Sequence, residues 1–291
     1  MPLARMQPFL WERARITHPR VLLNDCGSIE ERGLGSKGRG VRRLAKGYLR
    51  VLLWDFKKED ATWSRAVIYE VARTPAILSF MIITYHGGEC IKVAAGDTTL
   101  VFGPASKRSE SVKPANFGAD IVFVSLNHPD MNGTEEVSRG GKEPFIISGP
   151  GEYEISSVSA TGIPVQSSYG GVARTNTIYG ALFDGTAILY LGAVSDPNLS
   201  ADVLEQIETV DVLFVPIGGG EVLGSAGAHK LSVLLEAKVV IPIHWGDIGE
   251  KDALKNFLKE AGAEDIKPVE KLTIKQKDVA AMTGEVVVLK Q

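Results

Sequence analysis

The chain has 291 residues, of which 44% are hydrophobic, and a formal net charge of −3. This length suffices for one core of about 200 residues and a smaller appendage. A membrane-spanning helix is excluded, because the longest apolar stretch, residues 76–83, is interrupted by Ser79 and is far shorter than the roughly 20 residues that a span requires.

The amino-terminal residues do not resemble a secretory signal. They contain several arginines but neither a continuous apolar core nor a small-residue cleavage site. The two cysteines, Cys26 and Cys90, form no CxxC pair and no disulfide-rich pattern. We therefore expect both thiols to be reduced and the protein to be cytoplasmic.

The charge distribution divides the chain near residue 80. Residues 1–80 contain 15 Lys and Arg against 8 Asp and Glu, whereas residues 81–291 contain 17 against 27. Eleven of the fourteen arginines lie in the first part. We therefore predict two segments: an Arg-rich extension, residues 1–80, that is poorly structured or is not a true domain, and a folded domain, residues 81–291.

Within the extension, residues 33–40 (GLGSKGRG) form a basic tract that is followed by Arg42 and Arg43. Such a tract can contact phosphate groups or nucleic acid. This one lacks the GxxxxGK[ST] spacing of a phosphate loop, and short tracts of this composition are usually linkers. We interpret it as a linker and do not expect nucleic acid as a partner.

The folded part begins with strands in the sequence. Two consecutive hairpins are predicted, with turns at Gly87-Gly88 and at Gly96-Asp97. An enrichment in β-branched residues favours further strands downstream. The strands predicted up to this point are residues 81–86, 90–95, 98–102, 119–125, 144–148, 152–165, 177–183 and 187–192.

After Leu191 predicted helices alternate with strands. Ser200 and Ser225 can each N-cap a helix, and a third helix begins near Lys251 and ends at Gly262. Buried strands are predicted at residues 211–216 and 238–243. Hairpins followed by this alternation predict an α/β fold, a four-layer α/β/β/α sandwich in which helices cover two packed sheets.

In the stretch ADIVFVSLNHPDMNG, residues 119–133, a buried strand is followed at once by polar residues. This stretch resembles the signature of the metallo-β-lactamase superfamily, in which a strand ends in Thr/Ser-His-x-His-x-Asp-His. The resemblance implies that histidines coordinate zinc and that the aspartate helps to bind a second metal and to orient water. Aligned by its Ser and Asp, the chain has Leu126, His128, Asp130 and Met131 at the four ligand positions.

The resemblance covers nearly all of residues 81–290. It is carried by GPGEYEI, LFVPIGGG and IPIHWG, which are similar to segments of the lactonase-like branch, and it places His244 at the last metal-ligand histidine. In LVFGP, which is similar to an Ile-Asp-Pro segment of that branch, Gly103 replaces the aspartate. The family's bridging aspartate is missing at Ala193, and its middle histidine is missing in the region of Gln166.

Three family-like metal ligands remain: His128, Asp130 and His244. A catalytic zinc needs about three protein ligands and one open position, and a bridged metal pair needs about twice as many ligands. We therefore predict no dinuclear centre and at most one zinc ion, with no metal at all as the alternative. In such a site Asp130 would be the catalytic group that positions water.

Each of these residues also has a purely structural explanation. His128 can hold its turn through a hydrogen bond to a backbone carbonyl, and Asp130 is typical of a turn or a cap. His244 is the strongest candidate, since ligands gather at strand ends in α/β folds. His86 and Glu89, which flank a glycine turn, could supply substitute metal ligands, and Glu221, beside a second glycine run, could replace a lost acid.

Three functions stay open. The first is a metallo-β-lactamase-fold protein that is weakly active or non-catalytic, because buried polar positions without a role are expected to become apolar. The second is a metal-dependent hydrolase of an ester, lactone or phosphodiester with a reduced mononuclear site. The third is tethering to nucleic acid or anionic lipid by the basic first part. The sequence specifies neither the substrate, nor whether the ligand is a small molecule or a protein, nor the oligomeric state.

Overall fold

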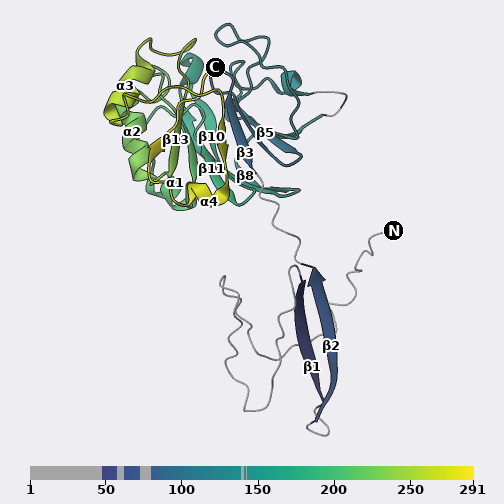
Figure 1. Cartoon of the computed structure of the whole chain (residues 1–291). Helices are drawn as coiled ribbons and strands as arrows, with labels where there is room; N and C mark the ends of the chain where they lie inside the picture. Colours follow the sequence, from purple (N-terminus) through teal and green to yellow (C-terminus); the bar gives the residue numbers. More distant parts are fainter. Residues whose placement is uncertain (1–47, 58–61, 73–79, 139–140, 142) are drawn as a thin grey trace. The chain divides into compact units, whose positions relative to one another are not determined.

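The computed structural model describes residues 48–57, 62–72, 80–138, 141 and 143–291. The chain divides into two compact units, Met1–Ile77 and Leu78–Gln291. In the first unit, β1 (Tyr48–Lys57) and β2 (Thr62–Ala72) pair in antiparallel fashion (Figure 1). The sequence did not predict these strands. The glycine tract at 33–40 and Cys26 lie outside the described residues, and the character of residues 1–80 stays a prediction.

The second unit contains two mixed β-sheets (Figure 1). The seven-stranded sheet has the order β15 (Glu285–Val286), β13 (Val239–Ile243), β12 (Val212–Pro216), β11 (Thr186–Tyr190), β10 (Arg174–Phe183), β9 (Val158–Ser167), β8 (Gly151–Ile155). The six-stranded sheet has the order β14 (Leu272–Ile274), β3 (Met81–Tyr85), β4 (Ile91–Ala95), β5 (Thr98–Phe102), β6 (Ile121–Phe123), β7 (Phe145–Ile147).

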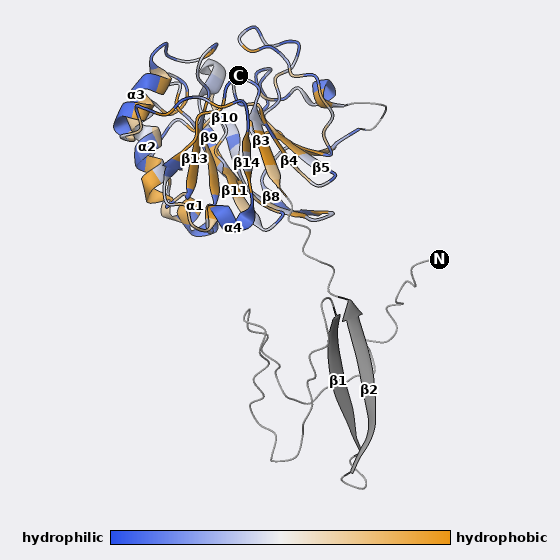
Figure 2. Cartoon of the chain, viewed as in Figure 1, coloured by the Kyte–Doolittle hydropathy of each residue, from blue (hydrophilic) through white to orange (hydrophobic). Residues whose placement is uncertain are grey.

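The main hydrophobic core lies between the two sheets. In β3 every second residue is buried, so Met81, Ile83 and Tyr85 all point into this core. Phe102 and Phe123 of the same sheet stack there with ring centroids 4.5 Å apart, and Tyr190 of the other sheet packs against Phe102. Figure 2 shows the apolar residues concentrated in the strands. The period-two burial therefore confirms the expected pairing of two sheets.

The outer face of the seven-stranded sheet is covered by helices α1 (Ala201–Gln206), α2 (Ser225–Leu234) and α3 (Ala253–Glu260). Phe257 of α3 and Leu231 of α2 are buried against this sheet in a second hydrophobic cluster. The outer face of the other sheet is covered by loops and by the 3-10 helix η2 (Thr134–Val137), with Val137 in a third cluster. The α/β/β/α sandwich is confirmed, with a thin fourth layer.

The observed elements differ from the predicted ones in a few places. The single strand predicted at residues 152–165 is wrong: the chain turns at Ser156, which has φ +57°, and forms the β8–β9 hairpin. The sequence also missed β14, β15 and the short helix α4 (Gln276–Val279). In the part of the chain that the structure describes, no helix has the length and apolarity to cross a bilayer.

Candidate functional site

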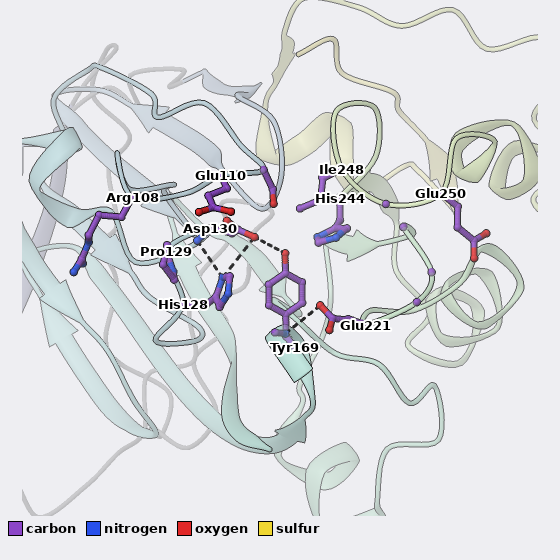
Figure 3. A pocket seen from close by; sticks show the side chains of 16 residues that line it. Arg108, Glu110, His128, Pro129, Asp130, Tyr169, Glu221, His244, Ile248 and Glu250 are labelled. Atoms are coloured by element: carbon purple, nitrogen blue, oxygen red, sulfur yellow. Dashed lines mark hydrogen bonds and ion pairs between the residues drawn. The ribbon is translucent and has the colours of Figure 1, made fainter. Parts of the chain in front are cut away.

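Loops that follow five strands meet at one edge of the sandwich. These loops come after β5, β6, β9, β12 and β13, and they line a cavity of about 620 Å³ (Figure 3). The residues that line it include Arg108, Glu110, His128, Asp130, Tyr169, Gly218, Glu221, His244 and Glu250. A cavity of this size at strand ends is the usual place for a small-molecule site.

His244 and Glu89 form a buried hydrogen-bonded pair at the floor of this cavity. His244 Nδ1 lies 2.8 Å from Glu89 Oε1, and the two residues are 3% and 1% exposed. Burial raises the pKa of Glu89, while the hydrogen bond to His244 lowers it. Tyr190 supports the pair through its hydroxyl, 3.3 Å from Glu89 Oε2. Because Nδ1 is engaged with Glu89, Nε2 on the opposite side of the ring is left for the cavity.

The backbone holds His244 in an unusual conformation. Its φ is +57°, which a non-glycine residue adopts rarely. The His244 N–H donates to the Gly88 carbonyl at 2.8 Å, which joins this loop to the first glycine turn. A side chain at Gly218 would collide with the His244 ring and carbonyl, so the glycine run lets the chain pass close to the histidine. These contacts fix the direction of the imidazole.

Asp130 is the second buried polar group of the cavity, and both of its oxygens accept hydrogen bonds. The Ser109 hydroxyl donates to Oδ1 at 2.6 Å and the Tyr169 hydroxyl donates to Oδ2 at 2.8 Å. His128 Nδ1 lies 3.5 Å from Oδ2 and accepts the backbone N–H of Asp130 at 3.3 Å. The carbonyl partner expected for His128 is therefore replaced by an N–H group.

Tyr169 stands between the two histidines (Figure 3). Its ring centroid is 5.0 Å from that of His128 and 5.7 Å from that of His244, with nearly perpendicular planes in both cases. Burial and the hydrogen bond to Asp130 both raise the pKa of the Tyr169 phenol, so the phenol stays protonated and acts as a donor. The tyrosine thus separates His128 and Asp130 from His244.

Glu221 holds the turn that carries Tyr169. Its two carboxylate oxygens accept the N–H groups of Gly170 and Gly171, each at 3.0 Å. The turn is the 3-10 helix η3 (Tyr169–Gly171), directly after β9. Glu221 therefore fixes the position of Tyr169 through this turn, and the prediction that it replaces a lost acid gains no support from these contacts.

The three predicted ligands all line the cavity, but they do not converge on one point. His128 and Asp130 contact each other, and His244 lies beyond the Tyr169 ring. Within residues 80–138, 141 and 143–291, no group of three or more His, Cys, Asp and Glu side chains is placed to hold a metal ion. The assignment of His128, Asp130 and His244 as ligands stays a prediction.

Comparison with known proteins places this architecture in a family. The model of the β-lactamase superfamily domain matches residues 82–244, which is more than half of the chain. The chain belongs to the metallo-β-lactamase superfamily. The resemblance inferred from the sequence motifs is confirmed.

Relatives within the superfamily carry names of metal-dependent hydrolases. A UPF0173 metal-dependent hydrolase of Bacillus licheniformis is 24% identical over 197 residues, which cover 57% of this chain and 85% of the relative. One of Listeria monocytogenes serotype 4b is 27% identical over 195 residues, with the same coverage. A crystal structure from Thermotoga maritima, named as a candidate Zn-dependent hydrolase, has 26% identity and a TM-score of 0.57, covering 72% of this chain and 98% of its own.

Several positions that align with ligands of the metallo-β-lactamase superfamily pack together as apolar residues. Leu126, Met131 and Ala193 form one buried cluster with Tyr169 and Val222. Leu126 is 2% exposed, and Met131 and Ala193 are fully buried. Gln166, in the region of the missing middle histidine, is exposed instead. A small hydrophobic core, the apolar wall, therefore lies behind the side of the cavity that Tyr169 lines.

A further departure from the metallo-β-lactamase pattern occurs at Gly103. A side chain there would collide with the Tyr190 hydroxyl and with Glu89. The aspartate of the Ile-Asp-Pro segment therefore has no room in this chain while Glu89 and Tyr190 are present. Glu89, which the sequence offers as a substitute metal ligand, instead contacts Nδ1 of His244.

Sequence reasoning missed Tyr169 and Ser109, the two hydroxyl donors to Asp130. Tyr169 lies in QSSYGG, next to the position at which the middle histidine of metallo-β-lactamases is expected. An aromatic residue followed by two glycines in that loop was the available signal. Ser109 lies 21 residues before Asp130 in a loop without a motif, so no sequence signal pointed to it.

Proposed function

We propose that this protein uses the metallo-β-lactamase fold as a binding module, that it forms no dinuclear metal centre and binds no stoichiometric zinc ion, and that its hydrolytic activity is weak or absent. The observation that carries the proposal is the position of Tyr169, whose ring lies between His128 and His244 while its hydroxyl binds Asp130. The cavity then serves to bind a small-molecule or protein ligand.

The donor set argues against a metal pair. Two bridged metals need about six protein ligands, and the aligned positions supply His128, Asp130 and His244. Both oxygens of Asp130 already accept short hydrogen bonds from hydroxyl groups. A metal at Asp130 would have to displace the Tyr169 phenol, which is held by burial and by the turn that Glu221 fixes. The residues present do not fit a two-metal site.

The apolar wall supports the same proposal. Burying Leu126 and Met131 in place of polar ligands stabilises the fold by about 2 kcal/mol for each large side chain. An unoccupied cluster of histidines and carboxylates at the same depth would instead cost free energy through desolvation. Leu126 and Met131 therefore pack as expected for a cavity that binds no metal pair.

A mononuclear metal-dependent hydrolase is the second candidate, and one contact favours it. Histidines that bind metals are commonly oriented by a carboxylate on their other nitrogen, which is the arrangement of Glu89 and His244. His128, Asp130 and His244 would be the ligands, with Asp130 positioning water. The names of the relatives agree with this candidate. It requires the Tyr169 hydroxyl to leave Asp130.

Metal content of the full-length chain distinguishes the two candidates. We expect native mass spectrometry and elemental analysis of protein purified without added metal, and again after incubation with zinc, to find less than one ion per chain. Tyr169→Ala, which removes both the ring and the hydroxyl, should gain zinc binding at Asp130. Tyr153→Ala, a tyrosine of β8 that does not line the cavity, is the matched control and should gain none.

Stoichiometric zinc in the unmodified chain would overturn the proposal if that zinc is lost in His128→Ala and His244→Ala. Turnover of an ester, lactone or phosphodiester that disappears in the same variants would also overturn it.

We also propose a cytoplasmic location. It is supported by the free thiol of Cys90, which is buried and has a pKa raised by burial to about 12.

A further inference from the structure

A second cavity lies at the other end of strands β12 and β13. The cavity of the candidate site follows these strands, whereas the second cavity precedes them, where the chain passes from α1 into β12 and from α2 into β13. The two connections run side by side, since the Lys238 N–H donates to the Val210 carbonyl at 3.2 Å. The second cavity has a volume of about 360 Å³ and shares no residue with the first.

The second cavity is an apolar groove between the ends of two helices. Its apolar lining residues, on α1, on α2 and shortly after them, are Leu204, Ile207, Val210, Leu234 and Leu235. Ile207 and Leu235 pack partly into the second hydrophobic cluster. Leu234 is instead 53% exposed, and the preceding Val233 is 62% exposed. Figure 2 shows apolar residues on α1 and at the end of α2. Large apolar side chains that stay in water beside a groove are typical of an interaction surface.

The rim of this groove is acidic. Its charged lining residues are Glu208, Glu236 and Lys238. The charge of Lys238 is balanced by Asp211, whose carboxylate lies 2.6 Å from Nζ. Glu208 and Glu236 are exposed, and in the part of the chain that the structure describes neither side chain has a hydrogen-bond or ion-pair partner. The uncompensated charge beside the apolar side chains is therefore negative, and it favours a positively charged partner.

One of these two carboxylates is carried by an unusual backbone position. Glu236 directly follows the C-cap of α2 and has φ +50°, where glycine is the usual residue. A glutamate in the left-handed region costs free energy relative to glycine. Among the described residues no contact of the Glu236 side chain offsets this cost. A contact with a partner would offset it.

We propose that this groove binds an amphipathic, basic segment of a partner protein. Apolar side chains of the segment fill the groove beside Leu234, and its lysine or arginine side chains pair with Glu208 and Glu236, which is the manner in which helices dock into grooves. The charge argues against the other occupants. Nucleic acid and anionic lipid would be repelled by the two carboxylates. A second copy bound about a twofold axis would bring the same acidic rim against itself.

Fluorescence anisotropy of a labelled peptide with the full chain tests the proposal. The probe is the synthetic peptide LKKLLKLLKKLLKL, whose helix has leucines on one face and lysines on the other. We expect saturable binding that added salt weakens, because part of the attraction is between charges. The same peptide with glutamate in place of every lysine should bind about tenfold more weakly. Equal binding of the two peptides would overturn the proposal.

Variants locate the binding site. Leu234→Ser should weaken binding of the lysine peptide about fivefold, because it removes apolar surface that the peptide would cover. Glu208→Gln and Glu236→Gln should each weaken it about threefold, as expected for exposed ion pairs.

Matched controls come from exposed residues that do not line the groove. Val172→Ser changes an apolar residue that is 55% exposed, and Glu152→Gln changes an exposed acid of β8. Both variants should bind the lysine peptide as the unmodified chain does. Weakening by these controls as large as that by the groove variants would contradict the assignment.

The oligomeric state tests the remaining occupant. Size-exclusion chromatography of the full chain at increasing concentration should show no self-association through the groove. Dimers that Leu234→Ser abolishes would assign the groove to a second copy and overturn the proposal. If Leu234→Ser does not fold, as circular dichroism would reveal, Glu208→Gln and Glu236→Gln still decide the question. None of these results depends on the metal content of the chain, because the groove and the candidate site share no residue.

Discussion

Two groups of buried residues beside the cavity, the apolar wall behind Tyr169 and a polar wall around His244, differ in the chemistry of their side chains. One wall is apolar, with Leu126, Met131 and Ala193 packed together. The other keeps a buried polar pair, Glu89 and His244, whose facing atoms lie 2.8 Å apart. Both walls are nearly inaccessible to solvent, so exposure does not explain the difference.

The difference lies in whether each polar group has partners. Glu89 has His244 and Tyr190, and His244 also has a backbone bond to Gly88. A buried polar group is tolerated when its partners are present and is costly when they are absent. The polar groups are therefore tolerated because they satisfy one another, whereas the apolar side chains stabilise the fold through packing.

The largest expected effect comes from breaking the polar pair. His244→Ala should lower the free energy of unfolding by about 3 kcal/mol, because it leaves the Glu89 carboxylate buried without its main partner. Chemical denaturation of the full chain measures this. Adding Glu89→Gln in the His244→Ala background removes the charge and should recover part of the loss. A double variant less stable than His244→Ala would show that the charge is not the cause.

Placing a polar ligand back on the apolar wall should have an intermediate effect. Leu126→His inserts an imidazole beside Met131 and Ala193, and we expect a loss of about 2 kcal/mol in unfolding free energy. Leu126→Met keeps the volume apolar and should cost less than about 1.5 kcal/mol. If zinc raises the melting temperature of Leu126→His but not of Leu126→Met, one substitution is enough to restore a metal site. That result would contradict the view that this wall serves only for packing.

Removing the Tyr169 hydroxyl should have the smallest effect on the free energy of unfolding. Tyr169→Phe keeps the ring but leaves Asp130 Oδ2 without its donor, and we expect a loss of about 1 kcal/mol. Tyr153→Phe is the matched control, since Tyr153 is only partly buried and donates to the Gly149 carbonyl. An equal loss in both variants would mean that the Asp130 contact contributes nothing specific.

Most of the second unit could be predicted from the sequence. The strand at residues 98–102 was predicted with its observed bounds, because β-branched alternation between glycine turns is a strong signal. The turn at Ser156 was missed because a serine in the left-handed region has no distinctive sequence pattern. The strands β14 and β15 were missed because they have three and two residues, too few to show a hydrophobic periodicity.

The site could be predicted only where it follows a strand. His128, Asp130 and His244 were predicted because the resemblance to the metallo-β-lactamase superfamily places metal ligands there, and each comes soon after a buried strand. The Glu89–His244 pair joins residues 155 positions apart, and the Tyr169–Asp130 bond joins residues 39 apart. Such pairings depend on tertiary packing, which a single sequence does not reveal. Tyr169, the residue on which the proposed function depends, was for that reason absent from the prediction.

The crowding around Gly103 makes the present arrangement hard to reverse by single mutations. Any side chain at this position meets the Tyr190 hydroxyl as well as the backbone carbonyl and Cβ of Glu89, so an aspartate can return only after Tyr190 has been made smaller and the backbone has shifted. Each such step removes support from His244 before the new carboxylate can provide any. A series of single mutations that rebuilds the full ligand set therefore passes through less stable variants. Position 103 thus hinders the recovery of a metal site.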